Sequence, residues 1–321
     1  MTIHLNEISE RDESLMSLSL ICVKQILIMF ILVALGFLCG KIKLIDKDTN
    51  SKLSGFVLEV VNPVLIFMSY QQDYDPELLK GLGLALLLGF ASYGIMIAVL
   101  SLIYRNKHSD EALVEQFAAI YSNCAFMGIP LINGLFGAEG VFYLTGYVTV
   151  FNVMVWSHGV IFFGGGKTQT SLKKVITSPA IISVAVGLIF FLSGIKIPEI
   201  IASAADYVGG MNTPLAMICA GVTIAGTDIK SHIRNLVVYR AAFFRLIFCP
   251  LVFWAIFRWF PIPDMVFMVV MAAAGCPAAA TGTMFAIRYK KCPEMAAVIF
   301  AVTTLMSAVT LPLLVTLGAS V

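Results

Sequence analysis

Two short motifs place a proline two residues after a glycine, each within a long apolar stretch of the chain. They are Gly128-Ile129-Pro130 and Gly275-Cys276-Pro277. Proline removes a backbone donor and clashes with the preceding turn, so we predict that each proline interrupts a helix. The N-terminal ends of the resulting half-helices carry partial positive charge, which favours an anion between them without a buried arginine. The alternative is a pair of proline kinks that serve packing alone.

Polar side chains close to these motifs are the expected contacts of such an anion. Asn123 lies about two helical turns before Pro130, and its amide can donate to a carboxylate. Its simpler role is a hydrogen bond between helices. Further polar residues nearby are Ser122, Asn133, Thr281 and Thr283, of which the threonines can bond their own backbone. The candidate substrate-binding residues are therefore Ser122, Asn123, Gly128, Ile129, Pro130, Gly275, Cys276, Pro277 and Thr281, with Pro130 and Pro277 as crossover hinges.

Ionisable residues inside or near apolar stretches form a second group of candidates, because charge within a membrane is costly unless it has a function. Lys24, Glu59, His158 and Asp206 belong to this group. Glu59 either carries a coupled proton or pairs with Lys24. His158 lies near a predicted helix end, where it either marks the membrane interface or carries a proton. The candidate scaffold or coupling residues are Asn62, Pro63, Asn212, Pro214, Glu59 and His158.

No sequence motif in the chain matches an enzyme active site or a metal site. The 7 cysteines show no CxxC spacing, the 4 histidines form no HExxH, and we expect neither a metal nor a cofactor. Gly164-Gly165-Gly166-Lys167-Thr168 resembles a phosphate loop, yet Ile161 stands where that pattern needs glycine. A net charge of +2 provides no basic face for nucleic acid. The protein is therefore not expected to be an enzyme or to bind nucleic acid.

The composition indicates that these motifs lie on helices within a lipid bilayer. Hydrophobic residues make up 59% of the chain and charged residues 12%, whereas soluble domains carry about 25% charged residues. Ten apolar stretches are long enough to span, and most lysines and arginines fall in alternate loops, which predicts that both termini face outside. The predicted spans are 18–40, 53–71, 78–104, 113–135, 141–163, 174–194, 204–226, 236–258, 264–287 and 294–318.

Similar motifs recur at about half the chain length. Asn62-Pro63 matches Asn212-Thr213-Pro214, and the two Gly-x-Pro motifs match each other. Five spans in each half give the halves opposite orientations. We therefore predict an all-α polytopic membrane protein with ten transmembrane helices in two inverted five-helix repeats and broken crossover helices 4 and 9. Its expected parts are a polar tail (1–17), the first repeat (18–165), a linker (166–173) and the second repeat (174–321).

These residues also resemble the auxin efflux carrier family, whose plant members export auxin and whose bacterial members include proteins described as malate and malonate permeases. Asn123 to Leu131 (NCAFMGIPL) is similar to the family's fourth-helix asparagine segment, and Pro63 to Phe67 (PVLIF) to its second-helix segment. Pro277 matches the ninth-helix proline. The likeness runs from about Ile21 to Leu317 and lacks the long central loop of some plant members.

The resemblance implies that helices 1, 2, 6 and 7 form a scaffold, and that helices 3–5 and 8–10 form a moving transport domain. Asn123 then corresponds to the family's substrate-contacting asparagine, and Pro130 and Pro277 to its crossover prolines. The alanines 278–280 depart from the pattern after Pro277. Related sodium-coupled carriers use acidic ligands near their crossing, and since no carboxylate is evident near either proline, sodium coupling is disfavoured.

Together these observations predict a multi-pass plasma-membrane secondary transporter or facilitator for a small organic anion, a carboxylate, that works by elevator-type alternating access. The lipid bilayer and the anion are its expected partners, and a homodimer is left open. An anion channel or a membrane sensor that uses the same broken helices without alternating access is the alternative.

Overall fold

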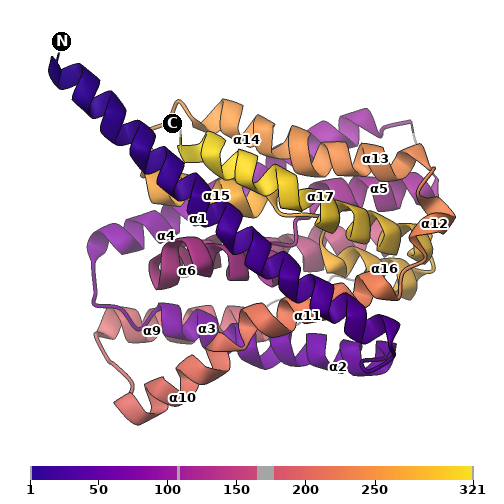
Figure 1. Ribbon diagram of the computed structural model, residues 1–321, viewed down its shortest axis with the longest axis horizontal. Coiled ribbons are helices and arrows are strands. Elements are labelled where there is room, and N and C mark those ends of the chain that lie inside the picture. Colours follow the sequence, from indigo (N-terminus) through magenta and orange to yellow (C-terminus); the bar gives the residue numbers. More distant parts are fainter. Residues whose placement is uncertain (1, 107–108, 165–176, 320–321) are drawn as a thin grey trace.

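The computed structural model describes residues 2–106, 109–164 and 177–319, so the predicted linker 166–173 lies outside the described residues. Within these ranges the regular structure is helical, apart from one isolated backbone bridge. The first helix, α1 (Thr2–Lys41), includes the stretch expected as a polar tail and projects beyond the other helices at its N-terminal end (Figure 1).

The described residues form seven helical segments long and apolar enough to cross a membrane, and two shorter apolar helices. The long segments are α1, α2–η1–α3 (Lys47–Phe56, Val57–Val61, Asn62–Ser69), α4 (Pro76–Ile103), η2–α6–η3–α7 (Cys124–Gly128, Ile129–Met154, Val155–Gly159, Val160–Gly164), α10–α11 (Glu199–Gly210, Asn212–Ala225), α13–η4–α14 (Leu236–Phe243, Phe244–Phe248, Cys249–Phe257) and α17 (Pro293–Ala319). The shorter ones are α9 (Pro179–Ser193) and α15 (Asp264–Gly275). The less apolar helices are α5 (Asp110–Ile120), α12 (Ile229–His232) and α16 (Ala280–Tyr289). The chain is thus an all-α polytopic membrane protein.

The segment from Cys124 to Gly164 folds back on itself at Gly137. Its 41 residues would extend about 60 Å as one helix, twice the thickness of the hydrocarbon core. Gly137 has φ 61° and ψ −151°, a conformation that is open almost only to glycine. Beyond it the chain returns alongside its own first part, because Leu144 lies 4.0 Å from where a Cβ on Gly128 would stand.

Helices α1 and α11 pack closely through glycines that face the partner's backbone. A Cβ on Gly36 would lie 2.1 Å from the carbonyl oxygen of Ile218, and one on Gly221 would lie 2.0 Å from that of Val33. A further close contact joins α9 to the end of α3: Gly187 of α9 faces the ring of Tyr70, which directly follows α3. Small residues allow this close approach, which in lipid supplies much of the attraction between helices.

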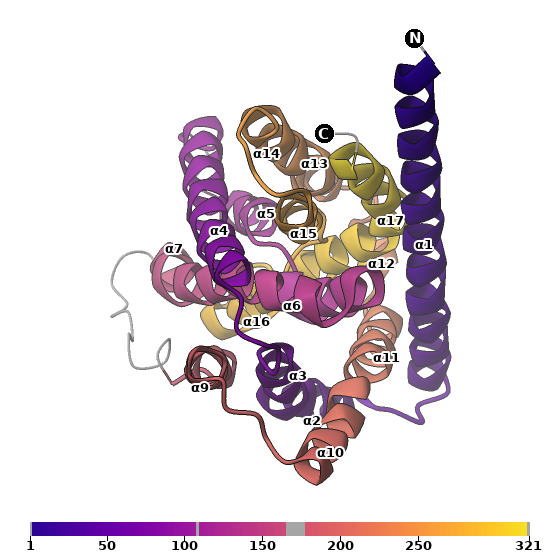
Figure 2. The same ribbon diagram turned by 90° about the vertical axis from the view of Figure 1, so that its left-hand side faces the viewer.

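The remaining helices pack around an aromatic core. Figure 2 shows α2, α3, α9 and α10 grouped together, separated by α6 from α4, α5 and α13 to α15. Buried tyrosines and phenylalanines lie between α6 and the second group, where the ring centroids of Tyr93 and Tyr147 are 5.3 Å apart and those of Phe117 and Tyr121 are 4.5 Å apart. This core surrounds the point at which two helices are interrupted.

Candidate functional site

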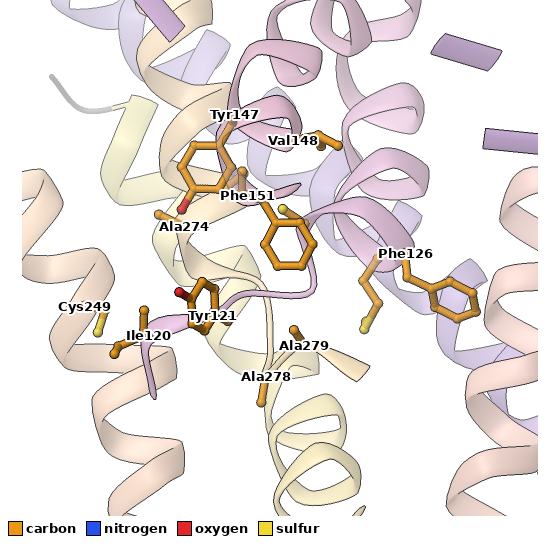
Figure 3. Close-up of a cluster of buried hydrophobic side chains, with 14 of the residues drawn as sticks. Ile120, Tyr121, Phe126, Tyr147, Val148, Phe151, Cys249, Ala274, Ala278 and Ala279 are labelled. Atoms are coloured by element: carbon orange, nitrogen blue, oxygen red, sulfur yellow. The ribbon is translucent and has the colours of Figure 1, made fainter. Parts of the chain in front are cut away.

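Two helices are interrupted at the centre of the fold, and the two interruptions pair with each other. Helix α5 ends at Ile120 and η2 starts at Cys124, whereas α15 ends at Gly275 and α16 starts at Ala280. The extended segments between them, 121–123 and 276–279, run antiparallel, with Ser122 bridged to Ala278. We call this pair of segments the crossing; Figure 3 shows Tyr121 on one of them and Ala278 and Ala279 on the other.

The crossing is held by two backbone hydrogen bonds. The N–H of Asn123 donates to the carbonyl of Pro277 at 2.7 Å, and the N–H of Ala279 donates to the carbonyl of Tyr121 at 2.9 Å. Broken helices leave backbone groups without partners, and a buried crossing must satisfy them. The two interruptions therefore stabilise each other.

The predicted interruption at Pro277 is present, whereas the one predicted at Pro130 is wrong in position. The chain passes from η2 into α6 without a break, and Gly128, Ile129 and Pro130 are buried in continuous helix. A π-helical turn precedes the proline: the carbonyl of Asn123 accepts from the N–H groups of both Met127 and Gly128, at 2.9 and 3.2 Å. Pro130 follows this turn as the second residue of α6 and does not interrupt the helix. The actual break lies seven residues earlier, so Gly128-Ile129-Pro130 is not the structural counterpart of Gly275-Cys276-Pro277.

Several predicted contact residues do meet at the crossing. The Asn123 side chain is 4% exposed, and its Nδ2 has no hydrogen-bond partner among the described residues. Thr281, in the first turn of α16, has a buried Oγ1 that likewise lacks one there. The hydroxyl of Ser122 lies 3.4 Å from that of Tyr93. The sulfur of Cys276 lies 3.5 Å from the position of a Cβ on Gly128. The hydroxyls of Thr281 and Thr283 were expected to form hydrogen bonds to the backbone of their own helix, but neither hydroxyl has a partner among the described residues.

Arg245 caps the crossing and was not among the predicted site residues. It lies in η4, is 2% exposed, and donates to the carbonyls of Ala119 and Ile120 at 3.0 and 2.8 Å and to the carbonyl of Ala274. These carbonyls end α5 and α15, the half-helices that lead into the crossing. A buried arginine is thus present beside the crossing, where the sequence motifs indicated only the half-helix ends. An arginine inside an apolar stretch was the available signal.

Glu115 is a second residue that sequence reasoning missed. Its fully buried carboxylate, in α5, accepts two hydrogen bonds of 2.7 Å from the guanidinium of Arg240 in α13. Asp110, at the start of α5, accepts from Lys291 at 2.6 Å. Bidentate geometry strengthens this pair, in which the Arg240 side chain is 46% exposed, and leaves neither charge free. The pairs attach α5 to α13 and to the loop before α17.

The candidate scaffold asparagines form a pair that contacts the start of η2–α6. The Nδ2 of Asn212 donates to the Oδ1 of Asn62, and the Nδ2 of Asn62 donates to the carbonyl of Ala125 at 3.4 Å. Both asparagines are buried. Pro63 follows Asn62 in the first turn of α3, and Pro214 lies in the first turn of α11. The motifs repeated in the two halves thus meet in space.

The ionisable candidates lie in different places. His158 lies next to the crossing, with its Nδ1 2.8 Å from the hydroxyl of Tyr121. Glu59 and Lys24 both have exposed side chains, and the described structure has no ion pair between them. Asp206 lines a cavity elsewhere.

This cavity, of about 260 Å³, lies between α3, the Gly137 turn of α6, and α10. Asp206 supplies its carboxylate, while Ser69 and Asn133 supply neutral polar groups. The other lining residues are Leu65, Met68, Ala138, Val141, Gly209 and Gly210. One lining residue, Gly210, precedes Asn212 of the asparagine pair by two positions in the chain. We call it the side cavity, since it is separate from the crossing.

Comparisons with known proteins agree with this architecture. A family model described as "Membrane transport protein" matches the chain twice, over residues 21–170 and 166–315, which indicates an internal repeat. An uncharacterized transporter of Methanothermobacter thermautotrophicus is 26% identical over 295 residues, which cover 90% of this chain and 96% of that protein. An uncharacterized transporter of Methanocaldococcus jannaschii is 25% identical over 239 residues, covering 70% of this chain and 75% of that protein.

Proposed function

The chain belongs to the membrane transport protein family, which contains the auxin efflux carriers, and from this premise we propose that it carries a small organic anion, a carboxylate, by alternating access at the crossing. It is a multi-pass membrane transporter and not an enzyme. The substrate and the mechanism are the proposal.

One observation carries this choice of substrate. The Nδ2 of Asn123 and the Oγ1 of Thr281 are buried without partners in the described structure, next to the starts of η2 and α16. Leaving a buried polar group without a partner costs about 1–3 kcal/mol. A carboxylate offers acceptors to an amide and to a hydroxyl simultaneously, so one small anion would satisfy both. Beside the crossing, the ring centroid of Phe151 lies 6.3 Å from that of Tyr121, and this ring offers an apolar surface to a short organic group.

The packing supports two bodies that move against each other. The proposed scaffold consists of α1, α2–α3, α9 and α10–α11, which the close glycine contacts hold together. The proposed transport body consists of α4 to α7 and α13 to α17, which share the aromatic core and the Asp110–Lys291 and Glu115–Arg240 pairs. We propose ten crossings in two inverted repeats. In this count α5 with the part of η2–α6 before Gly137 is one interrupted crossing, the chain after Gly137 is the next, and α15 with α16 is the second interrupted crossing. Both termini then lie outside a plasma membrane.

Counterflow in liposomes tests the proposal. Liposomes that contain the purified protein are loaded with unlabelled acetate, malonate or malate. Uptake of the same labelled compound is then compared with uptake of the neutral amides acetamide and malonamide. We expect saturable carboxylate uptake that is stimulated by the same carboxylate inside, and little amide uptake. Flux without stimulation would indicate a channel, and uptake of the amides in place of the carboxylates would overturn the choice of substrate.

Asn123→Ala should reduce carboxylate uptake by about tenfold or more, because an amide donor to an anion contributes about 1.5–3 kcal/mol. The matched control is Asn152→Ala, since the Asn152 amide donates to the carbonyl of Val148 in its own helix at 2.9 Å. We expect the control to retain uptake. Equal losses in both variants would show that Asn123 serves stability and not substrate binding.

A further inference from the structure

Four helix ends meet at the crossing, and their partial charges oppose one another. The C-terminal ends of α5 and α15 carry about −0.5 charge each, while the N-terminal ends of η2–α6 and α16 carry about +0.5 each. Their sum is near zero. Broken helices alone therefore do not make this site positive, and a substrate that experienced only these four ends would gain little from being an anion.

Arg245 removes this balance. Its guanidinium donates to Ala119, Ile120 and Ala274, the carbonyls at the two negative ends. It adds a full positive charge where the partial negative charges lie, so the crossing as a whole becomes positive by about one unit. Among the described residues Arg245 has no carboxylate partner, and the buried carboxylate of Glu115 binds Arg240 instead.

The charge is close enough to act on a substrate at Asn123. Ile120, which accepts from Arg245 at 2.8 Å, precedes Asn123 by three residues, an extended backbone length of roughly 10 Å at most. The guanidinium is 2% exposed, so water does little to screen it. At this distance in a protein interior, one charge changes the binding of an anion by about tenfold or more.

We propose that Arg245 sets the charge selectivity of the crossing: it caps the two C-terminal half-helix ends and supplies the positive charge that makes the site prefer a carboxylate to a neutral solute. This inference rests on the proposed function. Arg245 is a positioning residue in this scheme, since it acts through the carbonyls and the field and not through contact with the substrate.

The test compares malonate with malonamide, a pair that differs in charge but little in shape. Binding of both is measured by thermal shift and by competition with the carboxylate that gives the largest counterflow signal. Wild-type protein should prefer malonate by about tenfold or more. Arg245→Lys keeps the charge and should keep this preference, although affinity for both compounds falls because one amine cannot reach all three carbonyls. Arg245→Gln should lose the preference while still binding malonamide.

Ala278→Asp provides a second variant if Arg245→Gln does not yield a monodisperse protein. It places a negative charge on the crossing while Arg245 keeps its carbonyl contacts, and it should abolish the malonate preference in the same way. Retention of the preference in either charge-altering variant would overturn the inference, as would wild-type protein that binds both compounds equally. If wild-type protein transports carboxylates but the Arg245→Gln variant still prefers malonate, only this inference is overturned. If wild-type protein takes up no carboxylate, the proposed function itself is overturned.

Discussion

The backbone N–H of Asn123 donates to the carbonyl of Pro277 at 2.7 Å, so residues more than 150 positions apart in the chain share the central hydrogen bond of the crossing. Pro277 contributes its carbonyl while its ring prevents α15 from continuing into α16. The same contact positions the Asn123 side chain. Geometry at the proposed substrate site therefore depends on an interruption in the other half of the chain.

Pro277→Ala should reduce counterflow strongly, whereas Pro130→Ala should not. Replacement of Pro277 creates a run of alanines from 277 to 280, which favours a continuous helix and removes the extended partner of Asn123. We expect a loss of about tenfold or more in uptake, with the protein still folded. Pro130 is the second residue of α6 and lies in continuous helix, so its alanine variant should change uptake by no more than about twofold to threefold. Similar losses in both variants would mean that Pro130 acts as a hinge after all.

This contrast marks the limit of what the sequence could predict for the site. Composition and hydropathy indicated a polytopic all-α membrane protein, and both Asn123 and Pro277 were recognised from local motifs. The break at Tyr121 to Asn123 carries no glycine or proline, because the partner strand and not the local sequence stabilises it. Proline was a correct signal in one half and a misleading one in the other, where a π turn accommodates it.

The charged part of the site depends on contacts between distant segments. Arg245 caps carbonyls more than 120 positions earlier in the chain, and Glu115 meets Arg240 across a similar separation. Hydropathy shows that such residues lie in apolar stretches but does not show which partners they have. For the same reason, the sequence placed His158 near a helix end but did not show its contact with Tyr121.

Gly36→Ala and Gly221→Ala should each destabilise the protein. The added Cβ would lie 2.1 and 2.0 Å from backbone oxygens of the partner helix, so α1 and α11 must separate. We expect each variant to lower the unfolding temperature in detergent and the yield of monodisperse protein. Gly94→Ala in α4 is the control, since nothing lies within 4 Å of its added Cβ and alanine favours a helix by about 1 kcal/mol over glycine. Unchanged stability of both packed variants would contradict the close α1–α11 contact.

Asn62 and Asn212 should be energetically coupled. Asn212→Ala leaves the Oδ1 of Asn62 without its donor, and Asn62→Ala removes both that acceptor and the bond to Ala125. A double-mutant cycle on thermal or denaturant unfolding should give a coupling energy of about 0.5–2 kcal/mol, as for other buried hydrogen bonds between membrane helices. Asn152→Ala combined with Asn212→Ala serves as the control cycle, and its two effects should be additive. Additivity in the Asn62–Asn212 cycle as well would show that the pair does not interact in solution.

Asp206→Asn should strengthen the apparent affinity for carboxylates if an anion reaches the crossing through the side cavity. The ionised Asp206 repels an anion there, by about 1 kcal/mol at 4 Å in water and more where water is partly excluded. Its replacement by a neutral amide of similar size should therefore lower the half-saturating carboxylate concentration by about twofold to tenfold, with a smaller gain at high ionic strength. Asn133→Asp adds a carboxylate to the wall of the same cavity and should have the opposite effect. Initial uptake rates at low and high salt measure both variants. If neither variant shifts the concentration dependence, anions do not pass through the side cavity, and the route to the crossing must lie between other helices.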